Sequence, residues 1–323
     1  MTPGEAQQQG SALHPQKVAD LLKPEKFPRT IMTAIPTLNG LAEIADRYDL
    51  ILCDVWGVLH DGQKAHTAAG EALIRFRTLS GDRPRRVVLV SNAPRPGDGV
   101  GRILDRFGVP REAYDAILTS GDLTHDLIAA RPGARIRHLG PERDLGIFQG
   151  LDLSLVPEAE ADLIVCTGLF DDRSETADDY RPELERLAAR GLTLICANPD
   201  LVVESGNRLI PCAGLIAAAY AEIGGAVVYA GKPHRPVYEA ALAKGGELAG
   251  APVDPARVLA IGDAIRTDIA GARGFGIASL LVARGIHAEE LGVTAEHHRL
   301  GDVADWLGQQ AVHPDAVIER LVW

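Results

Sequence analysis

The chain has 323 residues, of which 46% are hydrophobic and 24% charged, so it is long enough to form two domains with buried cores. Its net charge of -11 argues against a general affinity for nucleic acid or for an anionic membrane, because both are negatively charged. No segment reaches about 18 uninterrupted apolar residues, and the polar N-terminus lacks the apolar run of a signal peptide. Four widely separated cysteines are typical of a reduced compartment, so we expect a cytoplasmic protein that binds neither membrane nor nucleic acid.

Residues 1–16 are expected to form a flexible tail, and beyond them short apolar runs alternate with helical patterns. Strands are predicted at Leu50–Cys53, Val87–Val90, Ala116–Leu118, Leu163–Cys166, Leu192–Cys196, Val227–Tyr229, Val258–Ile261 and Leu280–Val282. Helical spacing precedes Gly108 and the pair Gly224–Gly225, where two helices are expected to end. The alternation predicts an α/β fold with a doubly wound parallel-sheet (Rossmann-like) core, in which strands are covered on both faces.

The composition indicates the domain boundaries less clearly than it indicates the strands and helices. An acidic, loop-rich stretch at Asp171–Asp179 and proline-containing turns near Pro132 and Pro211 indicate an inserted α/β module over residues 122–211. The remaining segments, residues 17–121 and 212–323, are then expected to form the core.

Polar side chains follow four of the predicted strands at the point where each apolar run stops. They are Asp54, Ser91 with Asn92, Lys232, and Asp263 with Asp268. In an open parallel sheet the carboxyl ends of the strands face one crevice, so we expect these side chains to share a pocket. Three carboxylates beside one lysine suit Mg²⁺ and phosphate, because the cation prefers hard oxygen ligands and the lysine offsets anionic charge.

Each of these residues also has an ordinary structural explanation. An aspartate after a strand often caps the next helix, and Ser91 can do the same. Gly262–Asp263 can be a simple turn, and Lys232 an exposed loop residue. The occurrence of all four clusters together, in this chemical order, favours the functional interpretation.

The four clusters resemble the motifs of the haloacid dehalogenase-like (HAD) hydrolase superfamily, class IIA, in which a large cap is inserted between the second and third motifs. Asp54 opens the first motif, Ser91 is the second, and Lys232 in Gly-Lys-Pro-His is the third. The fourth runs from Gly262-Asp263 to Asp268, and the resemblance covers about residues 45–285. Residues 122–211 would then be the cap domain, and the enzyme would be similar to sugar or nucleotide phosphatases.

The resemblance implies covalent catalysis with Mg²⁺ as cofactor. Asp54 would attack the phosphorus and form an aspartyl-phosphate that water then hydrolyses. The metal ligands would be Asp54, Asp263, Asp268 and the backbone carbonyl of Trp56. The cation would screen the repulsion between the anionic nucleophile and the phosphate.

The resemblance also implies how the substrate is held. Ser91, Asn92 and Lys232 would bind the phosphoryl oxygens, and Lys232 would also assist catalysis. Asn198 and Asp200, in a stretch similar to the one that closes the cap, would contact the substrate. The partner would be a small phosphorylated metabolite, and a homodimer is expected because capped members of this group often dimerise.

Trp56 departs from the family pattern, which usually has a second aspartate there as general acid and base. An indole can donate one N–H but cannot shuttle a proton, and a positioned general acid is typically worth about 10²–10⁴-fold in rate, or roughly 3–5 kcal/mol. His60 and Asp61 are candidate substitutes, although a structural role in a turn is an equally good explanation. A leaving group of low pKa would also reduce the need for an acid.

Three functions therefore remain open. A Mg²⁺-dependent phosphatase is favoured because Asp54, Lys232 and both later aspartates are all present. A phosphate- or nucleotide-sensing protein with little or no turnover is the alternative that Trp56 favours. Dehalogenation or phosphomutase chemistry is a third possibility, and the metal-binding carboxylates count against dehalogenation because it needs no metal.

Overall fold

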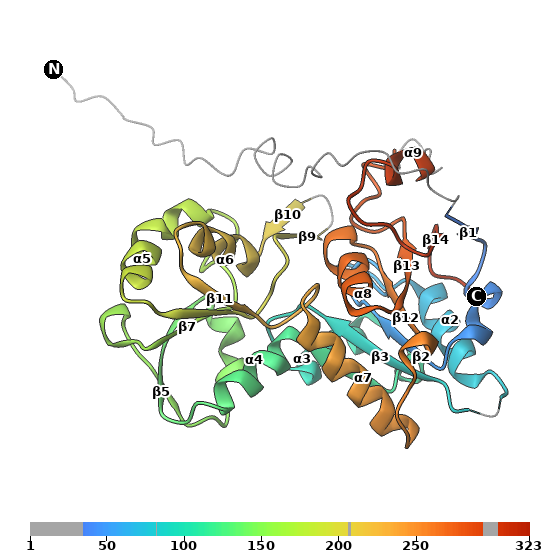
Figure 1. Ribbon diagram of the computed structural model, residues 1–323, viewed down its shortest axis with the longest axis horizontal. Helices are drawn as coiled ribbons and strands as arrows, with labels where there is room; N and C mark the ends of the chain where they lie inside the picture. Colours follow the sequence, from blue (N-terminus) through green and yellow to red (C-terminus); the bar gives the residue numbers. More distant parts are fainter. Residues whose placement is uncertain (1–34, 82, 206–207, 293–302) are drawn as a thin grey trace.

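The computed structural model describes residues 35–81, 83–205, 208–292 and 303–323. The expected tail at residues 1–16 lies outside this range. Two parallel sheets, each with helices against it, lie side by side, and the chain passes from the larger sheet to the smaller one and back (Figure 1). The α/β architecture and the parallel-sheet core predicted from the sequence are confirmed.

The larger sheet has seven strands, and every neighbouring pair is parallel. Its strands, in spatial order, are β1 (Thr37–Leu38), β14 (Ala316–Ile318), β13 (Ala278–Val282), β12 (Val258–Gly262), β2 (Leu50–Cys53), β3 (Arg86–Ser91) and β4 (Ala116–Thr119). The central strands β2 and β12 are buried along their whole length, which explains why they read as uninterrupted apolar runs.

Alternate residues of β2 supply the two hydrophobic layers of this sheet. Ile51 and Cys53 pack with the layer that contains α2 and α3, whereas Leu50 and Leu52 pack with the layer that contains α7 and α8. This is the period of two expected of a strand that is covered on both faces. The helices are α2 (Thr67–Thr78), α3 (Gly97–Phe107), α7 (Arg235–Ala249) and α8 (Ala270–Phe275). The predicted end of α3 at Gly108 is confirmed, with that glycine in the left-handed conformation.

The smaller sheet has five strands, again all parallel. In spatial order they are β6 (Leu153–Leu155), β5 (Ala134–Leu139), β7 (Leu163–Cys166), β8 (Thr193–Cys196) and β11 (Ala226–Tyr229). Helix α4 (Ser120–Ala129) leads into this sheet, while α5 (Ala177–Ala189) and α6 (Ala213–Glu222) pack together in one hydrophobic layer against it. The chain order across the sheet is therefore 2-1-3-4-5, with the direction of winding changing between β5 and β7.

The smaller sheet continues past residue 211, where the sequence analysis expected the inserted module to end. Strand β11 pairs with β8, and α6 packs on the same sheet, so the chain rejoins the larger sheet only after Tyr229. Composition does not reveal this boundary, because α6 is apolar on nearly every face and reads like any helix of the core. Pro211, where a turn was expected, is instead the last residue of β10 (Arg208–Pro211), which forms a small antiparallel hairpin with β9 (Val202–Ser205).

Short helical segments complete the described chain. They are the 3-10 segments η1 (Leu41–Glu43), η2 (Ala45–Arg47), η3 (Arg111–Ala113), η4 (Glu142–Phe148), η5 (Glu158–Glu160) and η6 (Pro255–Arg257), the π-helical segment η7 (Ile265–Ile269), and helix α9 (Val303–Leu307). Among the described residues, no helix has both the length and the apolar character required to cross a membrane.

Candidate active site

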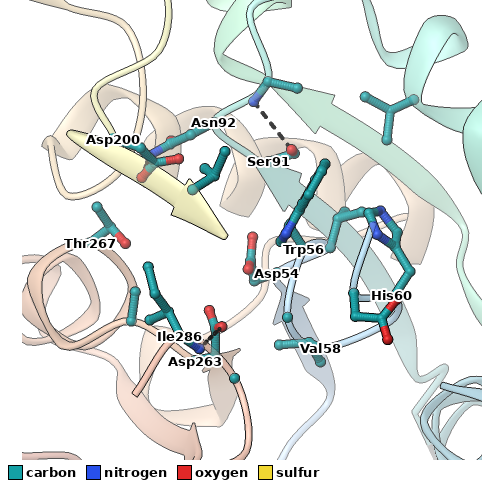
Figure 2. Close-up of a pocket in the computed structure, with 18 of the residues that line it drawn as sticks. Asp54, Trp56, Val58, His60, Ser91, Asn92, Asp200, Asp263, Thr267 and Ile286 are labelled. Carbon is teal, nitrogen blue, oxygen red and sulfur yellow. Dashed lines mark hydrogen bonds between the residues drawn. The ribbon is translucent and has the colours of Figure 1, made fainter. Parts of the chain in front are cut away.

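The carboxyl ends of both sheets face one cavity of about 920 Å³. Residues that follow β2, β3 and β12 of the larger sheet line one side, and residues that follow β5, β7 and β8 of the smaller sheet line the other. Figure 2 shows the larger-sheet side, with Asp54 beneath Trp56 and with Asp263 nearby. The four polar clusters expected to meet do so in this cavity, to which Asp54, Ser91, Asn92, Lys232, Asp263 and Asp268 all contribute.

Lys232 connects two of the aspartates. Its ammonium Nζ lies 2.5 Å from Asp54 Oδ1 and 2.7 Å from Asp268 Oδ1, and all three side chains are buried. Burial lowers the pKa of Lys232, but the charges of Asp268 and Asp54 more than compensate and hold it well above its ordinary value. Lys232 is therefore a permanent cation that fixes the orientation of both carboxylates.

Asp263 is held by the backbone on the far side of this group. Its Oδ2 accepts a hydrogen bond of 2.7 Å from the Ile286 amide (Figure 2). Gly57 and Gly285 leave the space for it, because a Cβ atom at either position would lie about 2 Å from Asp263 Oδ2. Gly57 also has a φ of +81°, a conformation that favours glycine. Sequence reasoning did not single out these glycines, since what makes them necessary is a neighbour far along the chain.

The three aspartates form a group suited to a hard divalent cation. One carboxylate oxygen from each of Asp54, Asp263 and Asp268 lies within 4.8 Å of the others. Burial, opposed by Lys232 and reinforced by Asp268, raises the pKa of Asp54 to about 7. Burial and the charges of Asp54 and Asp268 likewise hold the pKa of Asp263 well above its usual range. A bound divalent cation would relieve this repulsion, so the residues present fit Mg²⁺.

Adding a methyl group at position 285 is expected to disturb this carboxylate group. A Gly285→Ala substitution would place its Cβ 2.1 Å from Asp263 Oδ2, so that the aspartate must move. Because shifted ligand orientation typically costs about 10–100-fold in metal affinity, we expect a loss of this size in Mg²⁺ affinity, measured by calorimetric titration. Gly274→Ala is the matched control, since nothing lies within 4 Å of its Cβ position. An unchanged Mg²⁺ affinity in Gly285→Ala would contradict this role of Asp263.

The two residues at the end of β3 have different environments. The Ser91 hydroxyl accepts a hydrogen bond of 3.2 Å from the Ala93 amide (Figure 2). Asn92 is bound on both sides of its amide: Oδ1 accepts from the Lys232 backbone N–H at 2.8 Å, and Nδ2 donates to Asp200 Oδ1 at 2.9 Å. Asn92 thus joins the larger sheet to the segment that returns from the smaller one.

Asn198 and Asp200 lie at the same junction, after β8. Asn198 Oδ1 accepts from the Asp200 backbone N–H at 3.1 Å, which shapes the turn. Asp200 contacts Asn92, and both Asn198 and Asp200 line the cavity. Burial, partly offset by Lys232 and Asn92, raises the pKa of Asp200 to about 6. The structure thus brings these two residues to the pocket, at the junction of the two sheets.

Trp56 lies next to the nucleophile candidate, with its indole beside Asp54 and reaching toward Ser91 (Figure 2). Its ring packs edge-on against His60 at 5.0 Å between centroids, and His60 packs on Phe107 at 4.9 Å. Burial lowers the pKa of His60 to about 4, and its Nδ1 accepts a hydrogen bond from the Gly62 amide. A neutral, buried imidazole of this kind supports the indole and is a poor proton donor at neutral pH.

Asp61 has a comparable structural role. Its Oδ1 accepts hydrogen bonds of 2.9 Å from the amides of Gln63 and Lys64, as in an Asx turn. Burial raises the pKa of Asp61, but the two amides outweigh it and leave the pKa below its ordinary value. Asp61 is therefore ionised at neutral pH. The suggestion that His60 or Asp61 replaces the missing acid stays a prediction, and their environments do not favour it.

A wall on the side of the smaller sheet is formed by Arg143, Asp144, Thr167 and Asp172, of which only Asp172 lies in a loop that the sequence had marked; we call it the small-sheet wall. Arg143 Nη2 lies 2.6 Å from Asp172 Oδ2, and Asp144 Oδ1 lies 3.1 Å from Arg95 Nη2 of the larger sheet's loop. Sequence reasoning missed this wall because β5, which leads into it, alternates arginines with apolar residues and has no apolar run.

His138 lies just behind this wall, and its burial predicts how the stability of the protein depends on pH. Its Nε2 lies 2.9 Å from Thr167 Oγ1, and burial, aided by the charge of Arg137, lowers the pKa of His138 from 6.5 to about 4. Because the folded protein holds His138 neutral, this histidine adds to the free energy of unfolding above about pH 6.5. The contribution is lost as the pH falls toward 4, and the whole pKa difference corresponds to about 3 kcal/mol. We expect the free energy of unfolding of His138→Gln to fall less over this range, measured by urea denaturation. Equal losses in both proteins would contradict the assignment.

The chain is similar to several known proteins. The family described as haloacid dehalogenase-like hydrolase matches residues 51–154, and the one described as HAD-hydrolase-like matches residues 229–321. A D-glycerol 3-phosphate phosphatase from Mycobacterium tuberculosis is 27% identical over 266 residues, which are 79% of this chain and 69% of that protein.

Two solved structures are also similar. A glycerol phosphate phosphatase from Mycobacterium tuberculosis, in complex with magnesium, is 26% identical over 80% of this chain and 74% of that chain, with a TM-score of 0.59. A hydrolase of the haloacid dehalogenase-like family from Brucella suis 1330 is 46% identical over 88% of this chain and 100% of that chain, with a TM-score of 0.77. At this identity and coverage, with the motif carboxylates gathered in one cavity, the chain belongs to the haloacid dehalogenase-like hydrolase family.

Proposed function

We propose that this enzyme is a Mg²⁺-dependent phosphatase that acts on a small phosphorylated metabolite. The observation that carries the proposal is the buried group of Asp54, Asp263 and Asp268 at the carboxyl ends of the larger sheet, with Lys232 bonded to two of its members. Three carboxylates and one ammonium leave an excess of negative charge, which calls for a divalent cation before a phosphate can enter.

Asp54 is the proposed nucleophile. One of its carboxylate oxygens would form a bond to phosphorus as the bond from phosphorus to the leaving oxygen breaks, giving an aspartyl-phosphate and the anion of the leaving group, which takes its proton from water. Water would then attack the same phosphorus, releasing inorganic phosphate and restoring the carboxylate. Lys232 holds Asp54 in place, and its ammonium would donate to the phosphoryl oxygens. The Ser91 hydroxyl and the backbone amides after β3 would donate to the same oxygens.

Asp54, Asp263 and Asp268 would hold the cation, with the backbone carbonyl of Trp56 as a further proposed ligand. What Mg²⁺ supplies when bound is neutralisation of the charge that develops on the transferred phosphoryl group. Support comes from the magnesium complex of the Mycobacterium tuberculosis glycerol phosphate phosphatase, which is 26% identical to this chain.

The smaller sheet with its helices is the proposed cap, inserted between β4 and the segment that carries Lys232. It faces the carboxylates across the cavity and would surround the leaving group. Because Trp56 stands where an acid is usual and supplies none, proton transfer to the leaving oxygen would be unassisted at this position. We therefore propose that leaving groups of low pKa depart fastest from this enzyme.

The test is phosphate release from a panel of sugar, nucleotide, aryl and acyl phosphates, with Mg²⁺ or with EDTA. The proposal expects turnover that requires the metal and increases as the leaving group becomes more acidic. Turnover unaffected by EDTA would sink the metal-dependent mechanism. Binding of Mg²⁺ and phosphate esters with no release from any member of the panel would favour a sensor instead.

A further inference from the structure

The small-sheet wall lies where a doubly wound sheet ordinarily binds a ligand. The smaller sheet has the strand order 2-1-3-4-5, and its winding reverses between β5 and β7. In such sheets ligands bind outside the carboxyl ends of the strands, at the reversal. The residues of the wall come from these two ends: Arg143 and Asp144 follow β5, and Thr167 and Asp172 follow β7.

The backbone brings these two ends into close contact. Gly140, the first residue after β5, has a φ of +148°, and a Cβ atom there would lie 2.0 Å from Thr167 Oγ1. Only a residue without a side chain lets the loop after β5 approach β7 this closely. Thr167, whose Oγ1 lies 2.9 Å from His138 Nε2, is one of the residues that line the cavity.

The charges of the wall cancel once Arg95, which reaches it from the loop after β3, is included. The Arg143–Asp172 pair lies beside the Arg95–Asp144 pair, at 2.6 Å and 3.1 Å, and each arginine is matched by one aspartate. A wall of zero net charge does not attract a second anionic group. It offers guanidinium donors and carboxylate acceptors side by side, which is the pattern that neighbouring hydroxyl groups satisfy, since each hydroxyl both donates and accepts.

We infer that the small-sheet wall is a leaving-group subsite for a polyhydroxylated, uncharged group, so that the substrate is a sugar-like phosphate monoester. This inference rests on the proposed function. Trp56 narrows the class of sugar phosphates further. With no general acid at that position, the leaving oxygen departs as an anion. The anomeric oxygen of a sugar does so more readily than the oxygen of an ordinary alcohol, because the hemiacetal hydroxyl is the stronger acid. Hexose 1-phosphates combine both features.

Hexose 1-phosphates and phenyl phosphate make a matched pair of probes, because each carries one phosphate on a six-membered ring and only the sugars carry hydroxyl groups. Binding is measured by calorimetry with Mg²⁺ in an Asp54→Asn background, which cannot turn over by the proposed route and keeps one side-chain oxygen for the metal. Turnover by the unmodified enzyme is measured separately, so that failure of the phosphatase proposal and failure of the subsite are distinguishable.

The expected result is that the tightest hexose 1-phosphate binds better than phenyl phosphate, and that Arg143→Ala or Asp172→Asn reduces this preference at least about tenfold. Arg135→Ala is the control. Arg135 pairs with Asp162 at 3.3 Å in the same part of the chain and is 56% exposed, as is Arg143, but it does not line the cavity.

Three outcomes would overturn the inference. The first is that no hexose 1-phosphate binds better than phenyl phosphate. The second is a preference that survives both Arg143→Ala and Asp172→Asn. The third is tighter binding of an ester with an anionic leaving group, such as a phosphorylated hydroxy acid, which would direct attention to Lys64 and Arg320 on the opposite wall.

Discussion

Replacing Asp54 by asparagine is expected to abolish phosphate release, lowering kcat by a factor of at least about 10⁴. An amide oxygen is a far weaker nucleophile than a carboxylate, and the other two carboxylates of the group, Asp263 and Asp268, are proposed to hold the cation. Asp54 is buried at the end of β2, with its backbone N–H bonded to Ile261 and its Oδ1 bonded to Lys232. The measurement is steady-state turnover of the best substrate of the panel, with Mg²⁺ saturating.

Asp162→Asn provides the matched control, since this aspartate is half exposed and pairs with Arg135 away from the cavity. Its kcat is expected to equal that of the unmodified enzyme. An Asp54→Asn enzyme that retained turnover within about tenfold would show that phosphoryl transfer does not go through this carboxylate.

Lys232→Met is expected to weaken both the fold and the reaction. Removing the ammonium leaves Asp54 and Asp268 buried without the partner that lies 2.5 Å and 2.7 Å from them. Breaking a buried ion pair by removing one partner typically costs about 3–5 kcal/mol, so we expect a loss of this order in the free energy of unfolding, measured in EDTA. Added Mg²⁺ should recover part of it, because a cation that binds only the folded state stabilises it.

Turnover of Lys232→Met should fall about 10²–10³-fold even with Mg²⁺, since one preorganised donor to the phosphoryl group is lost. Lys244→Met is the control: its ammonium pairs with Glu247 at 2.7 Å on an exposed part of α7. If Lys232→Met matched Lys244→Met in both stability and turnover, the bridging role of Lys232 would be refuted.

Much of the larger sheet could be predicted from the sequence because its strands are buried on both faces. Leu50–Cys53 was predicted with its observed bounds, and the predicted strands at 87–90 and 258–261 are each part of an observed strand. Some of the strands that are short or partly exposed have no apolar run of this kind. β1 has two residues, and β6 has three that are half-buried or exposed, so neither was expected.

The site was predictable to the extent that topology determines it. Asp54, Asp263 and Asp268 follow β2 and β12, adjacent parallel strands whose carboxyl ends lie together. Lys232 follows β11 of the smaller sheet, and the family resemblance, now confirmed, assigned it to the same pocket. The supporting contacts were not predictable, because they join residues distant in the sequence through close packing. Gly285 against Asp263 is one example, and Gly140 against Thr167 is another.

The residues around Trp56 could not be assigned roles from the local sequence pattern. The sequence identified it as a departure from the family and suggested His60 or Asp61 as replacements, from proximity alone. The structure places His60 between Trp56 and Phe107, and engages Asp61 with the amides of its own turn. These environments depend on a ring from α3 and on burial, neither of which a short motif reveals.

The stereochemical course at phosphorus tests the central claim most directly. A phosphorothioate ester, whose phosphorus carries sulfur and two different oxygen isotopes, is hydrolysed in water enriched in the third isotope, and the configuration of the released thiophosphate is determined. Transfer first to Asp54 and then to water comprises two in-line displacements, so the account predicts net retention. Net inversion would mean that water attacks the substrate directly, and it would contradict the role of Asp54 as the covalent nucleophile.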